Sequence, residues 1–296
     1  MAITAEQVKE LREATGLGMM ICKKALTEAD GDMKQAMENL RKQGQATAQK
    51  RAGKAAKEGK VSVLVQDSTA LIYEVNSETD FVARNDDFLA FVDQLGPLLA
   101  SEKPADLDAA HALTAPAFDG QTVSERLTDL IGKIGEKITF RRFALVETDP
   151  SRQRVHSYVH GNGRIGVVVV LSADSGQALD TGAVADLGKE IAMQVAAANP
   201  MAVSRESVPA EIIEKEREVY RAQAEASGRP EKVWDRIVDG KLGKFYKESV
   251  LVEQEYIRDS DMSVADRIKQ AEKDAGCTVG VDSFVRFELG SEEPAS

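Results

Sequence analysis

The chain has 296 residues, 43% hydrophobic and 29% charged, a composition typical of a soluble globular protein with several domains or one domain with appendages. Its formal net charge of −11 argues against general affinity for nucleic acid phosphates, and no apolar segment is long enough to cross a bilayer. The first ten residues lack a secretory pattern, and the distant Cys22 and Cys277 suit neither a disulfide framework nor a zinc site, so we expect a cytoplasmic protein.

The first 56 residues are predicted to form three short helices. Thr4 and Gln7 have the spacing of a capping box at the start of the first helix. The glycines of "TGLG" separate the first helix from the second, and Asp32 can cap the third. A bundle of this size has a thin core, so we expect it to lean on another part of the chain.

Residues 41–60 carry seven basic residues and one acidic residue. We expect a helical extension that runs into a linker, because the stretch is rich in Ala and Gln. A charge run of this kind is usually a solvated face. No aromatic residues are interleaved with the basic ones, so the stretch is a weak signal for nucleic acid binding.

The middle of the chain alternates hairpins with helices. A first β-hairpin is predicted for "KVSVLVQ" and "ALIYEV", and a second for "RVHSYVH" and "RIGVVVVL" around the turn "GNG". A helix follows each hairpin, in "NDDFLAFVDQLGPLLASE" and at 184–198. A further helix in "SERLTDLIGKIG" is predicted to break around Gly132 and Gly135 before the strand of "EKITFRRFALVE". This repetition indicates two related α+β subdomains.

Apolar residues at helical spacing over about 209–250, interrupted by "SGRP", predict two helices that fold back as an antiparallel hairpin. Such an arm either contacts a partner or a second copy, or packs on the body of the protein. A helix at 264–275 and the strand "TVGVDSFVRFEL" close the chain. The predicted fold class is therefore α+β, with domains at 1–56, 57–140 and 141–296, the last of which contains the arm.

Several motifs resemble nucleotide or metal sites without meeting their structural requirements. "GNGRIG" fits the G-x-G-x-x-G pattern, but a strand follows it where a dinucleotide site needs a helix, so its glycines are predicted to be turn residues. His156 and His160 would lie about 13 Å apart on a strand, which argues against a shared metal. The chain lacks a G-x-x-x-x-G-K-[ST] phosphate loop, so we expect no nucleotide binding and no cofactor.

The segment "NSETDFVARND" at 76–86 places one aromatic residue, Phe81, in a polar connection between a strand and a helix. Thr79 is expected to cap the helix and Asp80 to lie in its first turn. Phe81 either packs beneath the loop or is held out for a partner, and the local residues leave both open. An enzyme that pairs Asp80 with a histidine is disfavoured, because no G-x-S-x-G or H-E-x-x-H motif accompanies them.

Two segments resemble the signature regions of bacterial elongation factor Ts, namely "LREATGLGMMICKKAL" at 11–26 and "EVNSETDFVAR" at 74–84. "KIGEKITFRR", "YVHGNGRIGVVV" and "VDSFVRFELG" resemble further family segments in the same order, so the likeness covers essentially the whole chain. Ser77 stands where many members have cysteine, and Ile21 stands where an acidic residue is common.

The resemblance implies a three-helix N-terminal module similar to ubiquitin-associated domains, two α+β subdomains with antiparallel sheets, and a coiled-coil arm. It implies a guanine nucleotide exchange factor, without covalent chemistry, that binds elongation factor Tu·GDP. Such a factor disturbs the Mg²⁺ and phosphate site of its partner and promotes GDP release. A homodimer or a 2:2 complex stays open, as does the alternative of a scaffold or chaperone-like binding module.

The resemblance also implies roles for individual residues. One loop would reach the nucleotide domain of elongation factor Tu and disturb its Mg²⁺ site, with Phe81 as an apolar wedge. The residues of this loop are Thr79, Asp80, Phe81 and Val82. The other implied partner contacts are Met19, Met20, Lys23, Ile134, Gly135 and His160.

Overall fold

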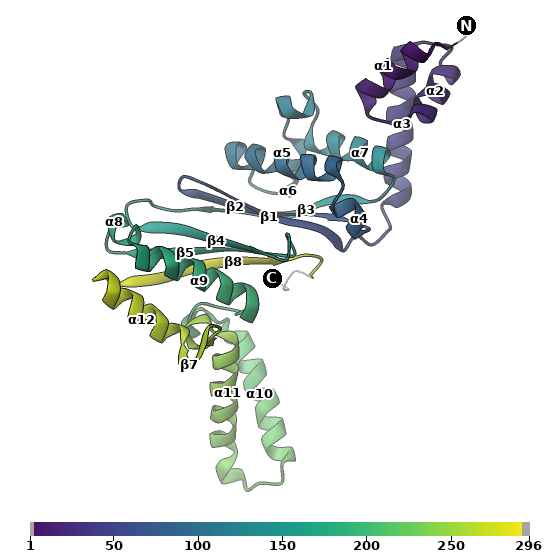
Figure 1. Cartoon of the computed structure of the whole chain (residues 1–296). Helices are drawn as coiled ribbons and strands as arrows, with labels where there is room; N and C mark the ends of the chain where they lie inside the picture. Colours follow the sequence, from purple (N-terminus) through teal and green to yellow (C-terminus); the bar gives the residue numbers. More distant parts are fainter. Residues whose placement is uncertain (1–2, 292–296) are drawn as a thin grey trace. The chain divides into compact units, whose positions relative to one another are not determined.

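The computed structural model describes residues 3–291, which form two compact units. Within the described residues, the first unit contains 3–62, 73–143 and 289–291, and the second contains 63–72 and 144–288. Figure 1 shows the helices and strands of both units. None of the described helices has the length and apolar character needed to span a membrane.

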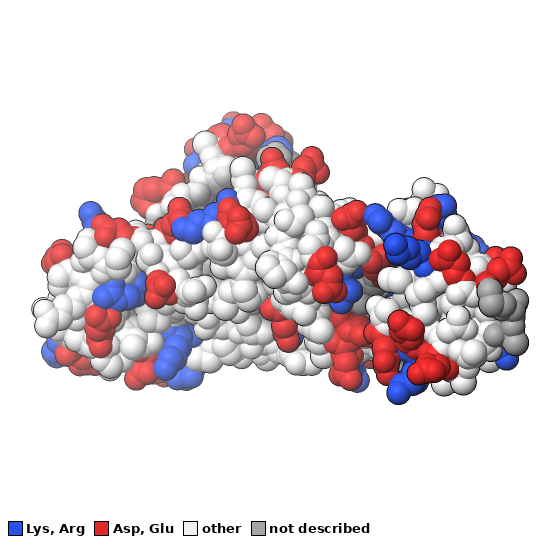
Figure 2. Space-filling view, turned by 90° about the horizontal axis from the view of Figure 1, so that it is seen from above, with Lys and Arg blue, Asp and Glu red and all other residues white. Residues whose placement is uncertain are grey.

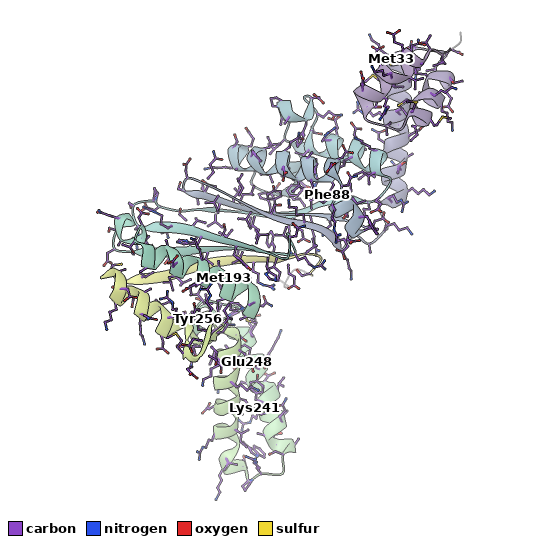
Figure 3. All side chains as sticks on the ribbon, in the orientation of Figure 1. Met33, Phe88, Met193, Lys241, Glu248 and Tyr256 are labelled. Atoms are coloured by element: carbon purple, nitrogen blue, oxygen red, sulfur yellow. The ribbon has the colours of Figure 1, made fainter. Side chains whose placement is uncertain are left out.

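The first unit begins with three helices, α1 (Ala5–Thr15), α2 (Met19–Glu28) and α3 (Met33–Arg51). Thr4 and Gln7 form the predicted capping box, and the Asp32 side chain accepts from the backbone of Gln35, so both predicted caps are confirmed. Met33 lies at the start of α3 against the small apolar core of this bundle (Figure 3). That core consists mainly of Val8, Leu11, Cys22, Ala25, Leu26, Ala36 and Leu40.

The basic stretch 41–60 forms the second half of α3 and the connection after it, as predicted, and its last three residues begin the first strand. Four of its basic side chains make ion pairs, namely Arg41, Lys42, Arg51 and Lys60. Figure 2 shows acidic and basic residues interspersed over the face that it presents. The stretch is therefore largely a solvated, ion-paired surface.

A three-stranded sheet follows, with the order β1-β2-β3. Its strands are β1 (Glu58–Gln66), β2 (Thr69–Ser77) and β3 (Ile138–Glu147), and residues 58–62, 73–77 and 138–143 of these strands belong to the first unit. The helices between β2 and β3 are α4 (Asp80–Ala83), α5 (Asp86–Glu102), α6 (Leu107–Ala112), the 3₁₀ turn η1 (Pro116–Phe118) and α7 (Val123–Ile134).

Helices α5 and α7 lie over one face of the strands of the first unit, where Phe88 of α5 is fully buried (Figures 1 and 3). Helix α7 passes through Gly132 and ends at Gly135, so the predicted break at Gly132 is wrong. Gly132 stays helical because its backbone packs directly on Gly44 of α3, and tertiary packing overrides the weak helix propensity of glycine.

One charged residue of β2, Glu74, is fully buried. Its carboxylate accepts from Arg142 at 2.7 Å, from the amide of Asn76 at 2.9 Å and from the backbone of Gly290 at 2.8 Å. A buried carboxylate needs such partners, because its desolvation costs several kcal/mol. Glu74 thereby fastens the segment after the last strand to the first unit.

The second unit is built on an antiparallel sheet with the order β4-β5-β8. Its strands are β4 (Gln153–His160), β5 (Ile165–Ala173) and β8 (Val279–Glu288). Strand β4 pairs with β5 from Gln153 opposite Ser172 to His160 opposite Ile165, which confirms the second hairpin. Because only Arg164 separates "GNG" from β5, the glycines there are turn residues, as predicted.

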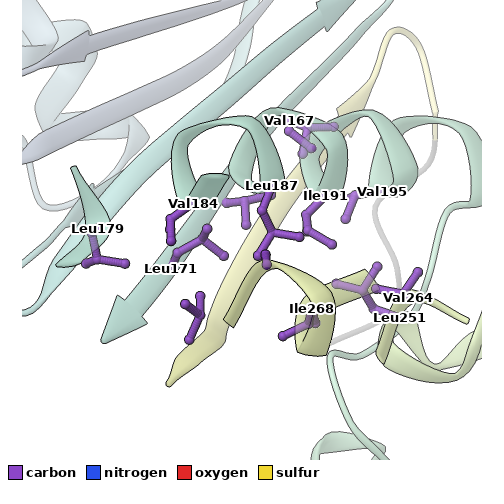
Figure 4. Packing of buried hydrophobic residues seen from close by; sticks show 14 of the residues in the cluster. Val167, Leu171, Leu179, Val184, Leu187, Ile191, Val195, Leu251, Val264 and Ile268 are labelled. Atoms are coloured by element: carbon purple, nitrogen blue, oxygen red, sulfur yellow. The ribbon is translucent and has the colours of Figure 1, made fainter. Parts of the chain in front are cut away.

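Helices α8 (Gly176–Leu179), α9 (Gly182–Ala198) and α12 (Val264–Ala275) complete the core of this unit. In Figure 4, Leu187 and Ile191 of α9 point into the same apolar cluster as Val167 and Leu171 of β5 and Ile268 of α12. The closing helix and the closing strand of the chain are confirmed. The two α+β subdomains thus share a plan in which a hairpin is followed by a long helix that packs on it.

The arm consists of α10 (Ala210–Ala226) and α11 (Trp234–Ser249), joined by a turn and the 3₁₀ segment η3 (Glu231–Val233), and the predicted helical hairpin is confirmed. At its base Ile212 and Phe245 pack against Val208 and Val250, while farther out the two helices contact each other (Figure 1). Sequence periodicity missed four short elements around this base. They are η2 (Arg205–Ser207), η4 (Leu251–Glu253), β6 (Glu255–Tyr256) and β7 (Asp259–Ser263).

Helix α9 approaches β4 at a glycine. A Cβ atom added to Gly188 would lie 2.2 Å from the ring of His156, far closer than real side chains come. Within the described residues the buried His156 Nε2 has no hydrogen-bond partner. Burial, followed by the positive charge of Lys189, lowers the pKa of His156 below its ordinary value.

We predict that Gly188→Ala destabilises the protein by about 1–3 kcal/mol, although alanine is the better helix former, because the new methyl group overpacks against the imidazole ring. Urea denaturation followed by circular dichroism measures the change. The double variant Gly188→Ala/His156→Ala should lose less free energy of unfolding than the sum of the losses of the two single variants. Purely additive effects would contradict a direct contact as the cause.

We also predict that the free energy of unfolding falls as the pH drops below about 6.5, the ordinary pKa of histidine. The folded protein holds His156 neutral, because its pKa is lowered, while the unfolded chain binds a proton there, so acid favours unfolding. His111 of α6, whose pKa burial also lowers, acts in the same direction. Chemical denaturation between pH 5 and 8 should show a shallower pH dependence for His156→Phe than for the parent. Parallel curves would contradict a contribution from His156.

Candidate functional site

The chain leaves β2 and forms one helical turn, α4, which carries the only aromatic residue of the predicted contact loop. Thr79 is the N-cap and accepts from the backbone of Val82, and Asp80 lies in the first turn, 3.1 Å from the guanidinium of Arg84. Val82 is buried, whereas the next-door side chain of Phe81 is 81% exposed. Neighbouring helical residues point about 100° apart, so anchoring Val82 inward directs Phe81 outward. The interpretation of Phe81 as core packing is therefore wrong.

Two carboxylates hold this loop against the end of α7. The Glu78 carboxylate accepts from the backbone N–H of Lys137 at 2.7 Å. In the opposite direction, the Glu136 carboxylate accepts from the backbone N–H of Thr79 at 3.1 Å and from its hydroxyl at 3.0 Å. We call this reciprocal pair of contacts the Glu78–Glu136 clamp. Hydrogen bonds to charged acceptors are stronger than neutral ones, so the clamp fixes α4 in place.

Ser77 belongs to the same support. Its side chain is buried, and its hydroxyl donates to the carbonyl of Thr79 at 2.9 Å. A hydroxyl is a better hydrogen-bond donor than a thiol, so serine at this position stiffens the loop. Ser77 therefore lies beneath the site, away from its exposed face.

Ile134 and Gly135 lie where α7 ends, immediately before Glu136. Ile134 is half-buried, and Gly135 caps the helix with a φ of 83° and donates to the carbonyl of Ile131 at 2.8 Å. Glycine suits this left-handed conformation because it has no Cβ atom. The turn at Gly135 delivers Glu136 to the clamp, so these two residues lie beside the contact loop.

The N-terminal bundle presents its own apolar surface at the start of α2. Met19 is 57% exposed, Met20 is 74% exposed and Ile21 is also exposed. We call these three residues the α2 methionine face. Lys23 is exposed on the same helix, and Cys22, Ala25 and Leu26 point into the bundle. Three consecutive exposed apolar residues are typical of a surface that another molecule covers.

An open hollow of about 400 Å³ lies between the loop after α1, the helix α4 and the end of α7. It unites Phe81, Val82 and Ile134 of the predicted contacts with residues that the sequence did not single out. The full lining comprises Gly16, Leu17, Gly18, Phe81, Val82, Asn85, Asp87, Lys133 and Ile134. The first unit therefore gathers three distant segments of the chain around one concave surface.

His160, the remaining predicted contact, belongs to the second unit. It ends β4, is exposed, and its Nδ1 lies 3.0 Å from the hydroxyl of Tyr158. The rings of the two residues lie side by side, with centroids 5.9 Å apart. His160 is thus exposed at the end of the strand, beside the half-buried Tyr158, which packs against the core of the second unit.

The charged residues around Phe81 make structural contacts. Within residues 3–291, no group of three or more His, Cys, Asp or Glu side chains is placed to hold a metal ion. The carboxylates around Phe81 are engaged with the backbone or with Arg84. Four residues of this site were not identified from the sequence, namely Glu78, Asp87, Lys133 and Glu136. Two of them, Lys133 and Glu136, lie in "KIGEK" close to Gly135, and this proximity was the available signal.

We predict that Glu136→Ala loosens α4, because it removes both hydrogen bonds to Thr79. Amide hydrogen exchange at residues 80–84 should accelerate on the order of tenfold, as a charged hydrogen bond contributes about 1.5–3 kcal/mol. Glu102→Ala, at the exposed end of α5, is the control and should leave these rates unchanged. Equal protection in Glu136→Ala and in the parent would show that the clamp does not hold the loop.

Comparisons with known proteins agree with the sequence resemblance. The family described as Elongation factor TS matches residues 78–291. Two proteins called Elongation factor Ts are each 45% identical to this chain. The match to the protein from Clostridium botulinum (strain Alaska E43 / Type E3) covers 97% of this chain and 93% of that protein. The match to the protein from Syntrophotalea carbinolica covers 98% of this chain and 94% of that protein. The protein of the same name from Chlorobium phaeobacteroides (strain BS1) is 45% identical over 98% of this chain and 99% of its own. The chain belongs to the elongation factor Ts family.

Proposed function

We propose that the chain is a guanine nucleotide exchange factor that acts on elongation factor Tu, the role known for its family. It binds the GDP form of its partner, disturbs the Mg²⁺ and phosphate site there, and promotes release of GDP so that GTP can bind. The observation that carries the proposal is Phe81, an aromatic side chain held 81% exposed on a clamped helical turn.

An exposed phenylalanine on a rigid support is suited to act as a wedge. Burying its side chain in a partner contributes about 1.5–3 kcal/mol, and the clamp means that little ordering entropy opposes the contact. GDP is held largely through its phosphates and Mg²⁺, an ion that demands near-ideal octahedral geometry. A small displacement of the partner elements that hold Mg²⁺ therefore weakens GDP binding.

The exchange requires only differential binding. A factor that binds the distorted or emptied partner more tightly must, by reciprocity, lower the affinity of that partner for nucleotide. No covalent step is needed, and we propose that the chain is not an enzyme and uses no cofactor. As a translation factor without a membrane-spanning helix in its described part, it is proposed to act in the cytoplasm.

The contacts divide between the parts of the chain. The loop of Thr79, Asp80, Phe81 and Val82 is proposed to reach the Mg²⁺ site, with Phe81 as the wedge and the buried Val82 as its anchor, and Ile134 and Gly135 lie beside it. Met19, Met20 and Lys23 would hold the nucleotide domain of the partner, and His160 would make a further contact. These roles correspond to functional domains at 1–56, 57–140 and 141–296.

We predict that the protein strongly accelerates release of fluorescent GDP from purified elongation factor Tu, and that Phe81→Ala loses on the order of 10- to 30-fold of this acceleration. The expected loss corresponds to about 1.5–2 kcal/mol of wedge contact. The free energy of unfolding should change by less than about 0.5 kcal/mol, because the side chain is exposed in the free protein.

Ile257→Ala, which trims another exposed apolar side chain in the second unit, is the matched control and should retain full acceleration. A parent protein that binds elongation factor Tu but leaves the GDP off-rate unchanged would instead be a scaffold or chaperone-like module. If Phe81→Ala unfolds the protein, the wedge role fails.

A further inference from the structure

Helices α3 and α7 cross at two glycines. A Cβ atom added to Gly132 would lie 2.7 Å from the Cα of Gly44, a separation that real side chains essentially never show. A Cβ atom added to Gly44 would lie 3.7 Å from the Cα of Gly132, which is ordinary contact. The two backbones are therefore in contact. A side chain at position 132 would clash with α3, whereas a Cβ atom at position 44 would fit. Each helical glycine costs about 1 kcal/mol relative to alanine.

Polar contacts flank the crossing along α3. On one side Arg41 pairs with Glu125 at 2.7 Å. On the other side Arg51 pairs with Glu78 at 3.2 Å, and the ammonium of Lys137 donates to the carbonyls that follow α3. Exposed ion pairs contribute little to stability individually. Because these contacts lie at both ends of the crossing, together they define the axial position of α3 relative to α7 and the rotation of α3 about its own axis.

Lys133, the neighbour of Gly132, braces the bundle from a second direction. Its ammonium lies 2.6 Å from the Asp87 carboxylate at the start of α5. It also lies against Gly16, so closely that a Cβ atom there would be 2.6 Å from the Lys133 Nζ. Gly16 caps the C-terminus of α1, where the helix dipole favours a positive charge. One side chain thus contacts both the bundle and the helix that follows the Phe81 loop.

We propose that the Gly44–Gly132 crossing and the Lys133 brace are a positioning device that sets the spacing between the α2 methionine face and Phe81. The inference rests on the proposed exchange function and adds to it a role for residues that do not touch the partner. Gly132 and Lys133 are positioning residues, since they act through the surfaces that they hold apart.

Fixed spacing matters because both surfaces must meet one partner. When the first contact forms, the second becomes intramolecular, with an effective concentration that depends on how well the two surfaces match the span between their targets. A bundle that swings loosely loses this advantage and must be ordered on binding. The bundle has only a small apolar core of its own, so the crossing supplies the rigidity that its interior does not.

The geometry offers a matched pair of substitutions to test the device. Gly132→Ala must push the helices apart, whereas Gly44→Ala fits the existing space, and both exchange a helical glycine for alanine. Spin labels at Glu10 of α1 and Ala90 of α5, both exposed, report the distance between bundle and body. The labelling background carries Cys277→Ser, and Cys22 is protected by burial.

Double electron–electron resonance on the isolated protein should show a longer or broader distance for Gly132→Ala than for the parent, and a still larger change for Gly132→Leu. Gly44→Ala should match the parent. Lys133→Met, which leaves the crossing intact, should broaden the distribution and serves as the second variant if Gly132→Ala does not fold. Identical distributions for all variants, or equal changes for the two alanine variants, would overturn the positioning device.

The same variants are then titrated in the GDP release assay with elongation factor Tu. For Gly132→Ala, the concentration giving half-maximal acceleration should rise about tenfold, with the limiting rate within about twofold of the parent. Phe81→Ala should instead lower the limiting rate. A loss of limiting rate alone in Gly132→Ala would overturn the inference. If the parent accelerates nothing, the exchange function fails, while the distance measurement still decides whether the device exists.

Discussion

The clamp made by Glu78 and Glu136 is the interaction on which the candidate site depends. Each carboxylate accepts a hydrogen bond from the backbone beside the other, which joins two loops that lie 57 residues apart in the chain. Without this support, exposing most of Phe81 would favour collapse of the loop onto the body, because burial of such a side chain is favourable by about 1.5–3 kcal/mol. The clamp and the inward anchor of Val82 oppose that collapse.

Both subdomains accommodate a ring at a glycine of their long helix. In the first unit, a Cβ atom on Gly96 of α5 would lie 2.7 Å from the hydroxyl oxygen of Tyr73, which donates to the carbonyl of Val92. Burial raises the pKa of Tyr73 to about 12, so the ring stays neutral and keeps this bond. In the second unit, Gly188 of α9 admits His156 in the same way. Close helix–strand packing thus recurs, with a different ring in each subdomain.

The proposed exchange mechanism fits a surface that works by shape and rigidity. The charged groups near Phe81 hold backbone and neighbouring side chains in place, and Phe81 is the apolar residue of this loop that is left exposed. A wedge acts through differential binding of two partner states, which demands a fixed contact more than a reactive group. The crossing at Gly44 and Gly132 extends the same principle to the bundle.

The sequence by itself determined the helices and strands wherever periodicity was sustained or caps were present. Thr4, Asp32 and Thr79 cap the helices that they predict, and both hairpins and the arm follow from alternation and turn residues. It failed for β6, which has only two residues, for β7, whose sequence DSDMS shows no apolar alternation, and at Gly132, where packing outweighs propensity.

The candidate site divides in the same way. The local sequence placed Phe81 at the start of a helix, and the family resemblance indicated which residues accompany it in the site. Neither decided whether the Phe81 side chain is exposed or buried. Only the tertiary structure decided that question, because the direction of the side chain depends on Val82 being buried and on Glu136 reaching back to Thr79. Contacts between residues 57 positions apart have no local signature, so no pattern along the chain could have specified them.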